Sequence, residues 1–351
     1  MSSTPGPIEA GSPESFAINP PLLNSSNPWA TTLADLTALY ACPLTGAVTT
    51  RTSLLQGFPH NAAQHQYTFF SGPGGAATAR VGEDGRSEVK SGEGCSLNTL
   101  GYSPIVLDEY LAMVVEVAAQ AASLLTERTT PKPFIVSVTG SAEEVAECYR
   151  RIAQVAAQNA QLTLFMEVNL SCPNILDKPP PAYDGAALAE YLRAIAAVKA
   201  GVHVGIKTPP YTYQGQYVTL MKTLEEATET CPISFITATN TLGSCLVLNE
   251  QNDPALSSAS GSGIGGVAGE AIHPLSLGNV KTIRSMLDAS PRADIKGISI
   301  IGIGGVSDGA GFRRMKSVGA AAVGVGTALG REGVAVFAKI TSSLNERDLT
   351  F

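Results

Sequence analysis

The sequence predicts an α/β protein, a (β/α)8 TIM barrel with inserted excursions in the βα loops at its C-terminal face. Three observations support this fold. Short β-rich runs alternate with longer helical segments from about residue 45 to the end of the chain. Most of the short runs are apolar throughout, as parallel strands covered on both faces must be. Eight such runs can be counted, which is the number that a closed barrel of this type requires.

In chain order, the strands are expected at Gly46–Thr50, Cys95–Asn98, Phe134–Val138, Leu164–Asn169, His203–Lys207, Ser234–Thr239, Ile298–Ile303 and Ala322–Val325. Helical periodicity lies between them, for example over 108–127, 142–159, 185–200 and 214–230. Capping residues mark some of the starts, such as Ser141 before Glu143 and Glu144, and Asp308 before a further helix. An open doubly wound sheet is the alternative, but its G-x-G-x-x-G fingerprint is absent after the first strand.

Three stretches interrupt the alternation: a polar region at 57–94, a proline-rich loop from Pro179 to Asp184, and a Gly- and Ser-rich region at 246–269. All three follow strands, so we expect them above the C-terminal face, where barrel active sites are built. The first of them is expected to form a hairpin or a similar excursion. Residues 1–17 are expected to be a disordered tail, because residues 1–15 are rich in Ser, Pro, Gly and Glu. Residues 18–351 then form one barrel domain.

Composition excludes several classes of function. The net charge of −7, with no stripe of lysine or arginine, argues against a nucleic-acid partner. The six cysteines are scattered and form no C-x-x-C pair, so we expect no metal site, no disulfide scaffold and a reducing, cytoplasmic environment. No apolar run of about 18 residues occurs, so no membrane-spanning helix is expected.

The richest chemistry follows the fourth expected strand, in the run Asn169-Leu170-Ser171-Cys172-Pro173-Asn174. Amide side chains suit recognition of an amide or imide edge, and a partly desolvated thiol can act as a proton-transfer base. The alternative is a tight turn in which Cys172 is a small apolar filler.

Glycine-rich turns follow the last two strands. Gly304 and Gly305 end the seventh strand, and Gly326 with Thr327 ends the eighth. At these positions of a barrel, backbone N–H groups and the next helix N-terminus commonly bind a phosphate group.

The run 169–174, with what surrounds it, resembles the dihydroorotate dehydrogenases, and particularly their soluble class that uses fumarate. The similarity extends from about Asn19 to Ile340. The resemblance implies an FMN cofactor, oxidation of dihydroorotate to orotate in pyrimidine (UMP) biosynthesis, fumarate as the electron acceptor and a homodimer. It also implies that Cys172 is the catalytic base and that Lys207 balances negative charge on the reduced flavin.

The resemblance further implies two sets of binding residues. The expected substrate-binding residues are Arg51, Asn98, Asn169, Asn174, Asn240 and Thr241. The expected cofactor-binding residues are Asn24, Ser25, Arg51, Thr52, Asn169, Lys207, Gly304, Gly305, Gly326 and Thr327.

The sequence departs from the family pattern around the expected pocket. Arg51 stands where the family has lysine, Tyr102-Ser103-Pro104 replaces a Leu-Pro-Asn run, and His273 stands where lysine is frequent. Arginine retains the charge but is longer and planar. Two alternatives therefore stay open: a related flavin barrel acting on uracil-like rings, and a catalytically silent flavin-binding relative.

Overall fold

The computed structural model describes residues 16–72, 77–81, 92–125, 131–175 and 179–349. Within these ranges, eight parallel strands form one sheet, in the order β1-β13-β12-β9-β8-β7-β6-β2. The strands are β1 (Leu22–Asn24), β2 (Val48–Thr49), β6 (Phe134–Val138), β7 (Leu164–Asn169), β8 (His203–Thr208), β9 (Phe235–Ala238), β12 (Ser299–Ile303) and β13 (Ala322–Val325). A parallel bridge between Leu23 and Ala47 joins the two end strands, so the barrel predicted from the sequence is confirmed.

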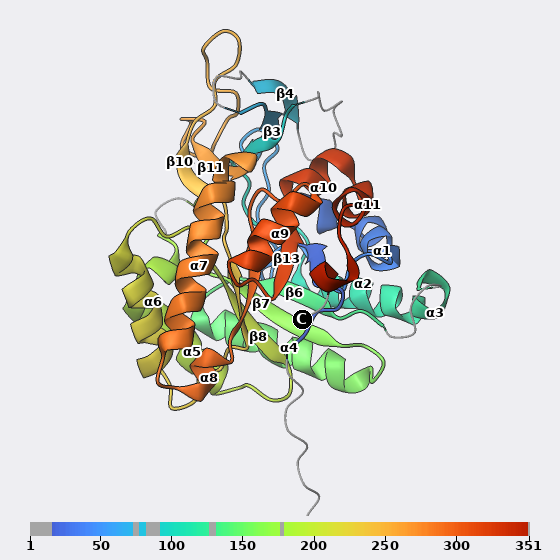
Figure 1. The fold of residues 1–351 in the computed structure, drawn as a ribbon, viewed down its shortest axis with the longest axis vertical. Coiled ribbons are helices and arrows are strands. Elements are labelled where there is room, and N and C mark those ends of the chain that lie inside the picture. The colour runs from blue at the N-terminus through green and yellow to red at the C-terminus, as the bar shows by residue number, and fades with distance from the viewer. Residues whose placement is uncertain (1–15, 73–76, 82–91, 126–130, 176–178, 350–351) are drawn as a thin grey trace, which may run out of the picture.

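Helices surround the barrel (Figure 1). They are α1 (Leu33–Ala41), α2 (Leu107–Ala119), α3 (Ala121–Leu124), α4 (Ala142–Gln158), α5 (Gly185–Ala196), α6 (Gln214–Glu226), α7 (His273–Ala289), α8 (Ala293–Lys296), α9 (Gly309–Ser317), α10 (Thr327–Glu332) and α11 (Ala335–Thr341). Short 3-10 helices lie at Pro28–Ala30, Pro181–Tyr183, Glu270–Ile272 and Glu346–Leu349. In the described part of the chain, none of the helices is long and apolar enough to cross a membrane.

The predicted cap of α4 is confirmed. The Ser141 hydroxyl accepts a hydrogen bond from the Glu144 backbone N–H at 3.2 Å, and the Glu144 carboxylate accepts one from the Ser141 N–H at 2.7 Å. This reciprocal pair satisfies two N–H groups that would have no partner within the helix.

One strand assignment was wrong. Cys95–Asn98 is a strand, β5, but it pairs antiparallel with β3 and β11 and lies outside the barrel. No strand lies between β2 and β6, which pair directly, and the eighth barrel strand is instead β1, Leu22–Asn24. A strand of three residues is too short to show a hydrophobic period, whereas β5 has the composition of a buried strand.

A second sheet contains β10 (Leu242–Cys245), β11 (Gly265–Gly269), β5 (Cys95–Asn98), β3 (Tyr67–Phe70) and β4 (Ala77–Val81), in that order. Its strands β3, β4, β10 and β11 lie at the upper end of the molecule in Figure 1. The hairpin of β3 and β4 confirms the excursion expected at 57–94, of which residues 73–76 and 82–91 lie outside the described ranges. The region 246–269, expected to be a loop, ends in β11.

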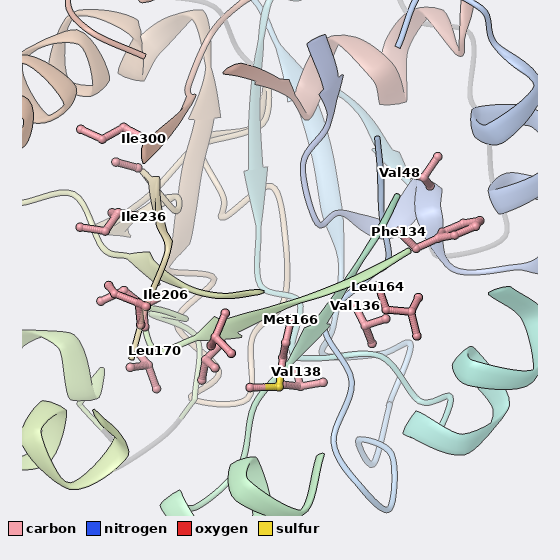
Figure 2. Packing of buried hydrophobic residues seen from close by; sticks show 14 of the residues in the cluster. Val48, Phe134, Val136, Val138, Leu164, Met166, Leu170, Ile206, Ile236 and Ile300 are labelled. Carbon is pink, nitrogen blue, oxygen red and sulfur yellow. The ribbon is translucent and has the colours of Figure 1, made fainter. Parts of the chain in front are cut away.

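Alternation along the strands separates two cores. Val136, Met166 and Ile206 belong to the large cluster between the barrel and the helices, part of which is drawn in Figure 2. Residues of the opposite strand faces, such as Phe165 and Phe235, form a separate cluster. Phe16 stacks on Phe235 with ring centroids 4.4 Å apart, whereas residues 1–15 of the expected tail lie outside the described ranges.

Candidate active site

A cavity lies between the carboxyl ends of the barrel strands and the second sheet. Its walls contain nearly all of the site residues expected from the sequence. They are Ser25, Arg51, Thr52, Asn98, Asn169, Cys172, Asn174, Lys207, Asn240, Thr241, Gly304, Gly305, Gly326 and Thr327. Side chains alternate between the two faces of a strand, so those at 165, 167 and 169 of β7 point to the same side of the sheet. Asn169, at the end of the strand, is the one of these three that lines the cavity.

Asn24 is the one expected site residue that does not line the cavity. Its side-chain amide donates to the Thr49 carbonyl at 2.6 Å and accepts from the Thr49 N–H at 2.9 Å. Asn24 therefore joins β1 to β2, the two strands between which the barrel closes.

Two asparagines, one at the end of β5 and one in the loop after β7, meet on one side of the cavity. Asn174 Nδ2 donates to Asn98 Oδ1 at 2.9 Å and to the Leu100 carbonyl at 2.9 Å. Asn98 Nδ2 donates to the Gly266 carbonyl of β11 at 3.1 Å. This pair connects the loop after β7 to the second sheet.

A second amide cluster surrounds the end of β7. Asn169 Oδ1 accepts hydrogen bonds from the Ser171 hydroxyl at 2.8 Å and from Asn240 Nδ2 at 3.3 Å. Its Nδ2 donates to Thr52 Oγ1 at 3.1 Å. The Thr52 hydroxyl in turn contacts that of Ser137 at 2.9 Å, so the orientation of the Asn169 amide is fixed from both sides.

Lys207 is the buried cation of the site. Strand register places it beside Asn169 on β7, and its exposed fraction is only 4%. Its ammonium makes no hydrogen bond or salt bridge to another residue in the described part of the chain, although it lines the cavity. Desolvation lowers the pKa of Lys207, and the charges of Glu167 and Cys172 oppose this shift. A charge in this position favours an anionic ligand.

Cys172 lies in the loop after β7 and is partly exposed to the cavity. Burial raises the pKa of its thiol above the ordinary value. The Asn174 backbone N–H, Lys207, the Tyr102 hydroxyl and Arg51 all oppose that rise. The thiol therefore lies among groups that stabilise its thiolate.

Arg51 supplies a second cation and is 5% exposed. Its Nη2 donates to the Tyr102 carbonyl at 3.3 Å, so the two departures from the family pattern are in direct contact. The planar guanidinium can bind a carboxylate through two parallel hydrogen bonds.

The two glycine turns line the same cavity at the ends of β12 and β13. His273 accepts a hydrogen bond from Arg314 Nε at its Nε2, at 3.0 Å, so its Nδ1 carries the proton that it donates to the Gly304 carbonyl, at 2.7 Å. Asp308 caps the N-terminus of α9, because its carboxylate accepts a hydrogen bond from the Gly311 N–H at 2.7 Å. The Asp308 carboxylate therefore occupies one of the N–H groups at the start of α9.

Sequence reasoning missed an aromatic wall. Trp29 and Tyr67 line the cavity, with ring centroids 5.4 Å apart, and Trp29 also stacks on Phe69 at 5.8 Å. A usable signal was present, since Trp29 is the only tryptophan in the chain and closely follows Asn24 and Ser25, two of the expected cofactor-binding residues.

The comparisons with known proteins agree with this geometry. The dihydroorotate dehydrogenase family model matches residues 74–347. The chain belongs to the dihydroorotate dehydrogenase family. It is similar to the dihydroorotate dehydrogenase (fumarate) of Trypanosoma cruzi, with 31% identity over 253 residues, which are 72% of each chain. It is also similar to the enzymes of that name from Saccharomyces paradoxus, with 30% identity over 253 residues, and Lachancea kluyveri, with 29% over 252, again covering 72% of each chain. As a dihydroorotate dehydrogenase family member, the chain is an oxidoreductase of the type that acts on CH–CH groups.

Proposed function

We propose that this chain is an FMN-dependent dihydroorotate dehydrogenase that oxidises (S)-dihydroorotate to orotate in UMP biosynthesis, with fumarate as the electron acceptor. The observation that carries the proposal is the meeting of Cys172, Lys207 and four asparagines in one cavity. The names of the curated relatives supply the substrate and the acceptor.

The residues present fit FMN. Lys207 is a buried ammonium that hydrogen-bonds no other residue of the described chain, and the N1 and O2 region of a flavin would give it an acceptor. The Gly305 backbone is in the left-handed region, with φ of +69°. A Cβ there would lie 2.7 Å from the Gly269 carbonyl oxygen, so the turn leaves room only for backbone. Gly304, Gly305, Gly326 and Thr327 would hold the phosphate.

The substrate also fits the remaining groups. Arg51 would bind the carboxylate of the ring, and the amides of Asn98, Asn169, Asn174 and Asn240 would bind its N–H and C=O groups. In the structure these amides hydrogen-bond to one another, so they are already oriented before a ligand binds.

FMN, when bound, supplies the acceptor for the hydride that leaves C6 of the ring. Cys172 removes the proton from C5, for which its thiolate form is required. Lys207 would stabilise the negative charge that the cofactor gains together with the hydride. Ser171 holds the Asn169 amide, and Thr241 lies at the edge of the pocket.

A uracil-like ring is the alternative substrate. Such a ring has no carboxylate for the planar guanidinium of Arg51 to bind, whereas dihydroorotate has one. Purified protein is therefore expected to reduce fumarate with dihydroorotate and to ignore dihydrouracil. Turnover of dihydrouracil with none of dihydroorotate would assign the site to the alternative.

A catalytically silent relative is the other alternative. A buried ammonium costs stability unless it binds something, which argues for a working anionic ligand site beside Lys207. Purified protein that carries flavin but turns over neither ring would favour the silent relative.

We also propose a cytoplasmic location and a homodimer. All six cysteines, at positions that the structure describes, are unpaired, which suits a reducing compartment. The homodimer follows from the sequence resemblance, and sedimentation of the purified chain measures it.

A further inference from the structure

We propose that the Tyr102 hydroxyl is a positioning group for Cys172. This hydroxyl donates a hydrogen bond to the Cys172 sulfur and stabilises the thiolate form that faces the main cavity. This inference rests on the proposed role of Cys172 as the base. Its test is independent of substrate turnover.

The first observation is a second cavity behind Cys172. Its walls are mostly apolar, with Leu54, Phe58 and Ile175 among them. Cys172 and Tyr102 are the two residues whose side chains or backbone line both this cavity and the main one. The thiol therefore lies at the boundary of the two cavities, next to the tyrosine.

The second observation is that Tyr102 is held at several points. Its carbonyl accepts a hydrogen bond from Arg51, and its ring meets Phe58 edge to face, with centroids 5.9 Å apart. Its hydroxyl interacts with the side chains of Cys172 and Thr139. Thr139 is itself fixed, because its hydroxyl donates to the Asn169 carbonyl at 2.9 Å.

The direction of the hydrogen bond follows from the chemistry of the two groups. Burial raises the pKa of Tyr102 above that of an ordinary phenol, and the charge of Cys172 adds to this rise. Tyr102 therefore remains protonated where Cys172 titrates, so it can only donate to the thiolate. The same hydrogen bond lowers the pKa of Cys172 and so opposes the effect of burial on the thiol.

Other charged groups also face the thiol. Lys207 and Arg51 both favour the thiolate through their charges, and the Asn174 N–H donates to the sulfur. Among these side chains, Tyr102 is the one that acts on the sulfur through a hydrogen bond and not through charge, and Tyr102→Phe removes its hydroxyl while leaving the ring in place.

The test is the rate at which iodoacetamide alkylates Cys172 as a function of pH, measured by mass spectrometry of the peptide in the full-length purified chain. In the parent protein, the rate rises with pH as the thiolate forms and then reaches a plateau. With Tyr102→Phe, the rise is expected at higher pH. Below the parent midpoint, the variant should react about tenfold more slowly, as expected for loss of one hydrogen bond to a charged group.

Two control variants distinguish the effect of losing the Tyr102 hydroxyl from the effect of a change in packing. Tyr191→Phe removes a hydroxyl from the same second cavity, but that hydroxyl donates to the Gly140 carbonyl at 2.7 Å, so the profile of Cys172 should not move. Tyr102→Leu removes the ring as well, so it reports how a change in packing alone moves the profile. A Tyr102→Phe profile that coincides with the parent profile would overturn the proposal, as would a shift seen only with Tyr102→Leu.

Discussion

At the scale of single residues, burial acts in opposite senses on the two proposed catalytic groups. Desolvation raises the pKa of the Cys172 thiol and lowers that of the Lys207 amine, so it favours the neutral form of each. The charge of each residue counters this effect on the other. A base and a cation that stabilise each other suit a reaction in which a proton and a hydride leave adjacent carbons.

The role of Cys172 can be tested with Cys172→Ser. A serine hydroxyl is a much weaker base at neutral pH, so turnover should fall by at least about 100-fold, which is the usual contribution of a general base. Flavin absorbance should persist, because the glycine turns and Lys207 are unchanged. Stopped-flow flavin reduction and steady-state turnover measure the effect.

Cys245→Ser is the matched control. Cys245 is also partly exposed, but it lies on β10 and its thiol donates to the Gly243 carbonyl at 3.4 Å, outside the lining of the main cavity. Its turnover should equal that of the parent. Full turnover by Cys172→Ser would refute the assignment of the base.

At the scale of the elements, the site depends on where strands end. Register places Asn169 beside Lys207 at the ends of β7 and β8, and the two glycine turns follow β12 and β13. These residues could be predicted from the sequence, because the apolar strand before each of them is recognisable. Tyr67 could not, because its place in the aromatic wall depends on the pairing of β3 with β5 across the excursion.

The turn after β12 supports a prediction about Gly305→Ala. The new Cβ would meet the Gly269 carbonyl oxygen and His273 Cβ, each at 2.7 Å, in addition to the cost of φ +69°. We expect lower thermal stability and at least about tenfold weaker FMN binding, since a shift of the turn moves its N–H groups. Thermal unfolding and flavin titration of the apoprotein measure the two effects.

Gly333→Ala controls for the backbone cost alone. Gly333 has a similar φ of +61°, but its Cβ would meet nothing within 4 Å. This variant should lose about 1–3 kcal/mol of stability, because a positive φ combined with ψ of −160° is a conformation that residues other than glycine rarely adopt, and it should keep its FMN affinity. Equal FMN affinity in both variants would argue against a phosphate site at Gly305.

At the scale of the whole molecule, the cavity is formed by two sheets that the linear sequence does not separate. Local patterns predicted the barrel because each apolar run agrees with its neighbours in period and length. They did not reveal that Cys95–Asn98 leaves the barrel, because a strand's partners are set by long-range pairing and not by its own residues. Asn24 shows the same limit, since its partner, Thr49, lies on another strand.

The most direct test of the proposed function is the visible spectrum of the purified protein before and after anaerobic addition of dihydroorotate. We expect flavin absorbance that bleaches when dihydroorotate is added and returns when fumarate is added. A flavin that dithionite bleaches but dihydroorotate leaves oxidised would contradict the assigned substrate, and protein without flavin absorbance would contradict the assigned cofactor.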